Sequence, residues 1–214
     1  MQDKSLREFR REFIAGELKE QDLLEGPHLQ FMEWMEDAMR SSISDPNAMS
    51  LATADRMGKP SVRIVLLKNA SEEGYSFFTN YNSRKGHELE ENPHASIMFF
   101  WPGLDRQLRI EGVVTKLAKN ESDDFFNSRP RLSQISSAIS PQSKVVESRE
   151  TLETKFKELD EQMADFPITR PSNWGGYILK PHSYEFWQGR EHRLHDRIQY
   201  ILEDGMWKKQ RLAP

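Results

Sequence analysis

The chain has 214 residues, of which 36% are hydrophobic and 30% charged, and its formal net charge is −4. This length suits one domain, or one domain with a helical appendage, which buries roughly 70% of the surface of the unfolded chain. The negative net charge supplies no general basic field, so we expect no nucleic-acid partner. The absence of cysteine excludes disulfides, thiolate catalysis and cysteine-ligated metals, and it fits a reducing cytoplasm.

No membrane partner is expected either. The N-terminal stretch MQDKSLREFRREF is charged throughout, which predicts no secretory signal. The longest apolar runs, such as residues 97–101, are far shorter than the roughly 20 residues of a membrane span. We therefore expect a cytoplasmic protein.

The first part of the chain has the apolar periodicity of a helix. Leu6, Phe9 and Phe13 share one stripe and predict a helix over residues 4–20. A second helix is predicted over residues 27–40, because proline is favoured at the first helical position.

After the predicted helix 27–40, most of the sequence pattern is typical of β-strands. A short helix is predicted over residues 83–91 with Ser83 as its N-cap, and helix returns over 119–163, broken by Pro130 and by the serine-rich loop 136–143. Antiparallel hairpins with helices grouped at the start and in the middle predict an α+β fold built on an antiparallel barrel. The predicted strands are 50–54, 61–68, 75–79, 95–101, 107–117, 174–179, 183–187, 197–202 and 206–212.

The segment FWQGREHRLHDR, residues 186–197, concentrates positive charge near the C-terminus. If this segment is extended, Arg193, His195 and Arg197 project from one face. Such a row repels itself unless an anion lies against it, and a guanidinium matches the geometry of a phosphate. The alternative is a solvated edge strand whose arginines pair with neighbouring acids.

A second basic motif is RIVLLK, residues 63–68. Arg63 and Lys68 are five residues apart, so a regular strand directs them to opposite faces. A cation on each face is costly without a partner. Either the strand ends reach solvent, or the strand has an anion site on each side.

Two further motifs combine cations with hydroxyl groups. In FTNYNSRKG, Arg84 and Lys85 follow a predicted helix start, where backbone N–H groups and cations can cradle a phosphate. NSRPRLSQ places Arg129, Arg131 and Ser133 together as a second small anion-binding set.

Seven motifs occur in a fixed order: RIVLLK, FTNYNSRKG, RQLRIEG, NSRPRLSQ, PQS, NWGGY and FWQGREHRLHDR. In order and wording they resemble the pyridoxamine 5′-phosphate oxidase family, from about Arg10 to the terminal RLAP. The resemblance implies an FMN-binding split β-barrel over residues 26–214, preceded by a helical segment, residues 1–25, that can fold over the active site as a lid. It implies a homodimer with FMN at the subunit interface and no metal. The reaction implied is oxidation of pyridoxamine or pyridoxine 5′-phosphate to pyridoxal 5′-phosphate, with oxygen reduced to hydrogen peroxide.

The resemblance assigns one set of residues to the flavin. Arg63, Arg84 and Lys85 resemble the ligands of the flavin phosphate. The contacts expected from the partner subunit are Gln142, Ser143, Trp187 and Arg197. The full set is Arg63, Ile64, Val65, Leu66, Leu67, Lys68, Phe78, Thr79, Arg84, Lys85, Gln107, Gln142, Ser143, Trp187 and Arg197.

A second set is assigned to the substrate. Lys68, Arg129 and Ser133 resemble the clamp of the substrate phosphate. Arg193 and His195 match residues that lie over the substrate ring, and they are the expected catalytic pair. The full set is Arg10, Arg11, Glu12, Phe13, Lys68, Phe125, Arg129, Ser133, Arg193, Leu194 and His195.

Two positions depart from the family pattern. Phe13 and Phe125 stand where many members have tyrosine. Phe125 lacks the hydroxyl that would bond the substrate phosphate, and a neutral hydrogen bond is worth about 0.5–1.5 kcal/mol. We expect weaker substrate binding, by several-fold, and no loss of activity.

Three other functions remain open on the sequence. The same barrel architecture also serves flavin or haem binders with another substrate. Glu191, His192 and His195 could form a metal site, although the two histidines would face opposite sides of a strand. An RNA-binding module would use the arginines and tryptophans, but the chain lacks net positive charge.

Overall fold

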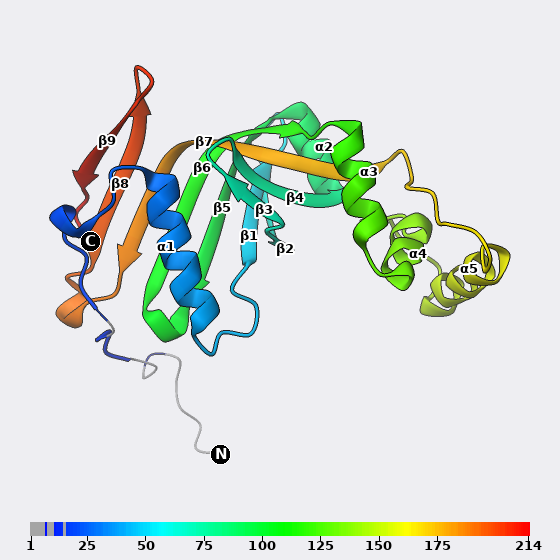
Figure 1. Ribbon diagram of the computed structural model, residues 1–214, viewed down its shortest axis with the longest axis horizontal. Coiled ribbons are helices and arrows are strands. Elements are labelled where there is room, and N and C mark those ends of the chain that lie inside the picture. The colour runs from blue at the N-terminus through cyan, green and yellow to red at the C-terminus, as the bar shows by residue number, and fades with distance from the viewer. Residues whose placement is uncertain (1–6, 8–10, 15) are drawn as a thin grey trace, which may run out of the picture. The chain divides into compact units, whose positions relative to one another are not determined.

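The computed structural model describes residues 7, 11–14 and 16–214 of an α+β chain (Figure 1). Its α-helices are α1 (Pro27–Arg40), α2 (Arg84–Glu91), α3 (Lys119–Ser128), α4 (Arg131–Ile139) and α5 (Arg149–Gln162). Its strands are β1 (Ala48–Ala54), β2 (Pro60–Leu66), β3 (Asn69–Ser71), β4 (Gly74–Asn80), β5 (His94–Trp101), β6 (Arg106–Lys116), β7 (Trp174–Gln188), β8 (Asp196–Glu203) and β9 (Met206–Arg211). Short 3₁₀ helices are η2 (Glu20–Asp22), η3 (Pro102–Leu104) and η4 (Glu191–Arg193).

The strands form one sheet in the order β2-β1-β5-β6-β7-β4-β3, and β8 pairs with both β7 and β9. The long strand β7 is antiparallel to β4 along its first part, where Gly175 lies opposite Thr79. Along its last part β7 is antiparallel to β8, and Trp187 lies opposite Arg197. Strand β7 therefore presents the NWGGY motif at one end and the FWQG motif at the other.

The chain divides into two compact units. The first unit combines the described residues up to Met49 with residues 97–111 and 181–214, and the second combines residues 50–96 and 112–180. Among the described residues, no helix has both the length and the apolar character that crossing a membrane requires.

In the first unit, helix α1 packs its aromatic face on the sheet (Figure 1). The Phe31 and Phe99 rings lie 5.6 Å apart, and the Trp34 and Phe186 rings lie 5.0 Å apart, edge to face. Residues three and four apart share one face of a helix, so Phe31, Trp34 and Met35 are buried together.

In the second unit, helices α3 and α4 close over the end of β4 and the start of β7. Phe126 of α3, Ile135 of α4 and Trp174 of β7 form a buried cluster. Phe78 and Phe125 pack against this cluster from its edge. This packing fixes the segment between α3 and α4, which carries the NSRPR motif.

The structure confirms much of the predicted order of elements. Helix α1 has the predicted bounds, and Ser83 caps α2 because its hydroxyl accepts a hydrogen bond from the Gly86 N–H. The predicted strands are present with small shifts at their ends, except that 174–179 and 183–187 are parts of the single strand β7. Residues 69–71, which lie between the predicted strands 61–68 and 75–79, form the short strand β3.

Two predictions about helices are wrong, one for the segment 4–20 and one for the serine-rich stretch 136–143. In the segment 4–20, the described residues 11–14 and 16–19 are not helical, and a 3₁₀ turn begins at Glu20. The rest of that segment, apart from Arg7, lies outside the described residues. The serine-rich stretch is not a loop throughout, because α4 continues to Ile139. Ile135 of α4 is buried, and this burial stabilises the helical conformation of the serines that follow it.

Candidate active site

A cavity of about 520 Å³ in the second unit gathers most of the predicted phosphate-binding residues. Among the described residues, those that line it include four cations and no carboxylate. A cavity with this charge is suited to anions. The lining residues are Arg63, Ile64, Val65, Leu66, Lys68, Phe78, Thr79, Lys85, Phe125, Arg129, Pro130, Ser133, Ser137, Gln142 and Trp174.

Arg63 is fixed from behind by a polar cluster. Its Nη1 donates to the Thr53 hydroxyl at 2.5 Å, and its Nη2 lies 3.2 Å from the Glu88 carboxylate. Burial alone would raise the pKa of Glu88, but hydrogen bonds from Ser61, Thr53 and the arginines outweigh it and lower the pKa to about 2. The ionised Glu88 thus holds the Arg63 guanidinium in one position at the cavity wall.

Lys85 is a buried cation in the first turn of α2. Its side chain is 8% exposed, and its Nζ donates to the Gln142 side chain at 2.8 Å and to the Thr79 hydroxyl at 3.1 Å. These partners are neutral, so burial, followed by the nearby Arg63 charge, lowers the pKa of Lys85 to about 8. An anionic ligand would offset both the burial of the Lys85 charge and its repulsion from Arg63.

Arg129 and Lys68 have no carboxylate within ion-pair distance in the described part of the chain. The Arg129 guanidinium lies over the Trp174 ring, 4.8 Å from its centre, and its Nη1 donates to the Ser137 hydroxyl at 2.7 Å. Burial lowers the pKa of Arg129 from its ordinary value, although the group stays charged. Arg129 is half-buried, so the lack of a counter-ion is costly for it, whereas Lys68 is exposed to solvent. A half-buried cation without a counter-ion is an expected feature of an anion site.

The prediction that Arg63 and Lys68 face opposite sides assumed a regular strand as far as Lys68. Strand β2 ends at Leu66, so the alternation of a regular strand does not extend to Lys68. Both cations line the same cavity. The RIVLLK motif therefore contributes two charges to one cavity.

An aromatic wall completes the cavity. The Phe78 and Phe125 rings stack with their centres 3.9 Å apart, and the Phe125 and Trp174 rings are nearly parallel at 6.3 Å. Stacked rings offer an apolar surface with a fixed orientation. Phe125 thus serves as part of a wall, which its sequence context had not indicated.

Several residues assigned to the flavin lie elsewhere. Arg84 and Ser143 line a neighbouring cavity of about 540 Å³, and Arg84 Nε donates to Glu88 at 2.8 Å. Leu67 is buried and does not line the main cavity. Gln142 was expected from the partner subunit, but it reaches Lys85 within the same chain.

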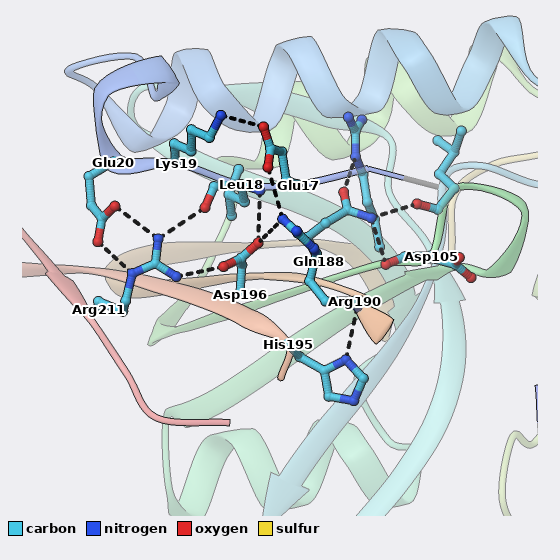
Figure 2. A network of polar contacts seen from close by, with 12 residues as sticks. Glu17, Leu18, Lys19, Glu20, Asp105, Gln188, Arg190, His195, Asp196 and Arg211 are labelled. Carbon is cyan, nitrogen blue, oxygen red and sulfur yellow. Dashed lines mark hydrogen bonds and ion pairs between the residues drawn. The ribbon is translucent and has the colours of Figure 1, made fainter. Parts of the chain in front are cut away.

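The predicted ring-binding residues belong to the first unit. His195 packs against Trp187, with ring centres 4.7 Å apart, and Phe13 meets both rings edge on. His195 Nδ1 accepts a hydrogen bond from the Arg190 backbone N–H at 3.1 Å (Figure 2). Burial, and next the Arg193 charge, lower the pKa of His195. These contacts define a neutral imidazole whose proton is on Nε2.

Arg193 and Leu194 are not in a strand, so the predicted row with Arg197 does not form. The chain turns at η4, where His192 and Arg193 have φ values of 57° and 63°. Left-handed backbone costs about 1–2 kcal/mol at residues other than glycine, and such strain is concentrated at functional sites. Arg193 and Leu194 are both exposed at this turn.

Arg197 has an acidic partner of its own. Its Nε and Nη2 donate to the two carboxylate oxygens of Glu185, at 2.9 and 3.1 Å. The alternative of arginines paired with neighbouring acids is thus correct for this residue. Gln107, on β6, also belongs to the first unit and does not line the cavity of the second.

The described part of the N-terminal segment is anchored to the first unit. Arg11 Nη2 lies 2.5 Å from the Asp105 carboxylate, and the Ile14 N–H donates to the same group at 3.2 Å. Arg11 and Glu12 are exposed, whereas Phe13 is half-buried against the rings of Trp187 and His195. Arg10 lies outside the described residues.

The remaining arginines of this region form an ion-pair network (Figure 2). Arg211 contacts both Glu20, at 2.6 Å, and Asp196, at 2.7 Å. Arg190 Nη1 lies 3.2 Å from both Asp196 and Glu17. These cations hold the N-terminal segment to β8 and β9. No group of three or more metal-ligating side chains that could hold an ion occurs among the described residues.

Two family models match this chain. The model described as pyridoxamine 5′-phosphate oxidase matches residues 35–163, and the model described as pyridoxine 5′-phosphate oxidase C-terminal dimerisation region matches residues 174–214. The chain belongs to the pyridoxamine 5′-phosphate oxidase family. This membership identifies it as a homodimeric protein of an FMN-binding family.

Individual relatives agree over nearly the whole length. A pyridoxine/pyridoxamine 5′-phosphate oxidase from Acinetobacter baylyi is 48% identical, over 99% of this chain and 98% of its own. One from Crocosphaera subtropica is 49% identical, over 96% of this chain and 97% of its own.

Solved structures confirm the fold. The crystal structure of PhzG from Burkholderia lata 383, in complex with tetrahydrophenazine-1-carboxylic acid, has a TM-score of 0.86 and 31% identity, over 91% of this chain and 95% of that one. An FMN binding protein from Nostoc punctiforme, 18% identical over 90% of this chain and all of its own, has a TM-score of 0.72. The predicted α+β split barrel is therefore correct.

Three residues that line the cavity were not predicted from the sequence: Pro130, Ser137 and Trp174. Trp174 is part of the NWGGY motif, but a tryptophan in such a pattern is more simply a core residue. Ser137 lies in the stretch predicted as a loop, and a loop has no helical periodicity that would relate it to Ser133. The helical register of α4 is the signal that would have found it.

Proposed function

We propose that this protein is an FMN-dependent oxidase that converts pyridoxamine or pyridoxine 5′-phosphate to pyridoxal 5′-phosphate. For the amine, substrate, oxygen and water give the aldehyde, ammonia and hydrogen peroxide; for the alcohol, substrate and oxygen give the aldehyde and hydrogen peroxide. The observation that carries the proposal is the cavity with four cations and no lining carboxylate, in a chain of this family.

The cavity fits the phosphate of FMN at its Arg63–Lys85 end. Lys85 is buried beside neutral partners and a second cation, a situation that a phosphate relieves. Thr79 and Gln142 complete the polar surroundings there. When bound, FMN supplies the capacity to take a hydride from the substrate and pass electrons to oxygen. The protein contributes position and charge.

The substrate phosphate is assigned to Lys68, Arg129 and Ser133 at the other end. Two cations without internal acidic partners favour the phosphate dianion over the alcohol or amine that lacks it. The wall of Phe78, Phe125 and Trp174 excludes water from one side of the cavity. Holding the reacting carbon in one place is the main contribution expected of such a clamp.

Arg193 and His195 are assigned to the reacting end of the substrate. A neutral His195 with its proton on Nε2 is a hydrogen-bond donor, and Arg193 is an exposed cation on a strained turn. Together they orient the substrate ring and stabilise negative charge on its oxygen. We assign both, with Trp187 and Arg197, to the active site of the other subunit in the dimer.

Mixed dimers test this sharing. At substrate concentrations well below KM, homodimers carrying Arg129→Ala and homodimers carrying Arg193→Met are each expected to retain little of the wild-type activity. After mixing and exchange, half of the dimers are hybrid and each has one intact site, so activity returns to about a quarter of the wild-type value. If both substitutions damage the same site of the same chain, mixing restores nothing.

The N-terminal lid and a cytoplasmic location remain parts of the proposal. Phe13 against His195 and Trp187 supports a lid that begins at the described residues 11–14. Deleting residues 1–14 is expected to leave FMN binding intact and to lower turnover. Cell fractionation tests the location.

The decisive experiment is an absorption spectrum of the purified protein, followed by pyridoxamine 5′-phosphate without oxygen. We expect flavin bands that bleach on addition of the substrate. Bands that persist would indicate a flavin-binding split barrel with another substrate. A protein that cannot be reconstituted with FMN would refute the proposal.

A further inference from the structure

Helix α4 presents two serines to the cavity on one face. Ser133 and Ser137 are four residues apart, so they lie one turn apart on the same side of the helix. Both line the cavity that holds Arg129 and Lys68. The intervening Ser136 is exposed, and its hydroxyl donates to the Leu132 carbonyl at 2.9 Å.

We propose that Ser137 is a further ligand of the substrate phosphate and donates its hydroxyl hydrogen to the oxygen atoms that Arg129 holds. The proposal rests on the proposed function, since it takes the cavity to receive a phosphorylated substrate. It adds a fourth member to the clamp of Lys68, Arg129 and Ser133. The ligand class is a phosphate monoester.

The hydrogen bond between Arg129 and Ser137 leaves the hydroxyl hydrogen of Ser137 available to another acceptor. Arg129 Nη1 donates to Ser137 Oγ at 2.7 Å, so this oxygen acts as an acceptor. A serine hydroxyl also has one hydrogen to donate, and Arg129 has no acceptor to offer it. In the described part of the chain, Arg129 is the only hydrogen-bond partner of this hydroxyl. An anion on the guanidinium would supply the missing acceptor.

Few other groups near Arg129 could donate a hydrogen bond to the substrate phosphate. Phe125 offers only a ring on its side of the cavity, and Pro130 has no N–H. The Thr79 hydroxyl is already bonded to Gln142 and Lys85. Near Arg129, the hydroxyl donors are therefore Ser133 and Ser137.

Steady-state kinetics of Ser137→Ala test the proposal. With pyridoxamine 5′-phosphate we expect KM to rise about tenfold and kcat to stay within about twofold, because the lost bond holds the phosphate and not the reacting carbon. With unphosphorylated pyridoxamine, kcat/KM should equal the wild-type value. Ser137→Thr, which keeps a hydroxyl, should restore KM, and Ser136→Ala should leave it unchanged. If the alanine variant does not fold, Ser137→Cys replaces it, because a thiol is a weak donor of similar size.

A double-mutant cycle separates direct contact from an effect through Arg129. If Ser137 touches the phosphate, Ser137→Ala still raises KM in an Arg129→Ala background. If the effect disappears there, Ser137 only positions Arg129 and the proposal is wrong. It is equally wrong if KM is unchanged in Ser137→Ala, or if KM for pyridoxamine rises as much.

The failure of the proposed function would look different. In that case the wild-type protein itself would not oxidise pyridoxamine 5′-phosphate. Inorganic phosphate then provides the remaining test, by calorimetry on the wild-type protein and the Ser137→Ala variant. Weaker binding by the variant supports the phosphate contact, and equal binding overturns it.

Discussion

Arginine side chains are concentrated in two regions of this protein, and they differ in what surrounds them. In the first unit, Arg190, Arg197 and Arg211 all have carboxylate partners within 3.2 Å. In the cavity of the second unit, Arg129 and Lys68 have no carboxylate within ion-pair distance among the described residues. The first group is satisfied by the fold, whereas the half-buried Arg129 has no counter-ion until an anion binds, and Lys68 is exposed to solvent.

The difference shows that charge clustering alone does not identify a binding site. A surface ion pair is worth about 0–1 kcal/mol and serves to fix a segment in place. A half-buried cation without a counter-ion costs free energy in the empty protein and returns it when an anion binds. Arg63 is intermediate, because Glu88 neutralises one side of it while the other side lines the cavity.

The largest effect is expected from Arg129→Ala. Hydrogen bonds to charged groups are worth about 1.5–3 kcal/mol, so KM for pyridoxamine 5′-phosphate should rise about 10- to 150-fold. The change in kcat should be much smaller, and KM for unphosphorylated pyridoxamine should not change. Initial-rate measurements of hydrogen peroxide formation give both constants.

The matched control is Arg149→Ala, which removes an exposed arginine paired with Glu153 on α5. Its kinetic constants should equal those of the wild type. If Arg129→Ala also leaves KM unchanged, the unpaired cation is not a phosphate ligand and the comparison between the two regions fails.

The next effect concerns pH and Lys85. With a pKa of about 8 in the folded protein and 10.5 ordinarily, Lys85 loses its proton in the folded state first. Since phosphate binding needs the charged form, the dissociation constant of FMN should be constant below pH 8 and rise above it, by up to about tenfold per pH unit. The free energy of unfolding of the flavin-free protein should increase over the same range, because the unfolded chain binds more protons.

Quenching of FMN fluorescence between pH 7 and pH 9.5 measures this dependence. Lys85→Arg is the control, because arginine stays charged throughout the range. Its dissociation constant should not vary with pH. A wild-type protein with an equally flat profile would show that Lys85 does not hold the cofactor phosphate.

A smaller effect is expected from Arg211→Ala in the paired region. The substitution removes contacts with Glu20, Asp196 and the Leu18 carbonyl, all near the surface. We expect a loss of about 1 kcal/mol, or a fall in Tm of about 2–4 °C, at fixed protein concentration. KM for the phosphorylated substrate should change less than threefold. A rise in KM as large as that of Arg129→Ala would remove the distinction between paired and unpaired arginines.

How far the sequence predicts this molecule depends on the range of the interactions. Local patterns located α1, the Ser83 cap and most strands, because periodicity and capping act within a few residues. They did not predict the end of β2 before Lys68 or the turn at His192 and Arg193. Those features depend on packing and backbone strain that no short window contains.

The same limit applies to the site. The motifs named the cations as candidates, but Arg84 and Lys85 are adjacent in sequence and line different cavities. Glu88 accounts for this separation, since it binds Arg84 at the surface and orders Arg63 from behind. Arg63 and Glu88 are 25 residues apart in sequence, so no short motif indicates that this cation is paired.

The smallest effect is expected from Phe125→Tyr. Phe125 is stacked on Phe78 with ring centres 3.9 Å apart and lines the cavity, so a hydroxyl on its ring can reach a ligand without disturbing the stack. One added hydrogen bond is worth about 0.5–1.5 kcal/mol, so KM for pyridoxamine 5′-phosphate should fall by about two- to twelvefold. In the Ser137→Ala background the gain should be at least as large, because the phosphate then lacks one donor. Phe78→Tyr is the control, since it adds a hydroxyl to the other ring of the stack. If Phe125→Tyr raises KM, the stack leaves no room for the hydroxyl and this side of the cavity is closed to the phosphate.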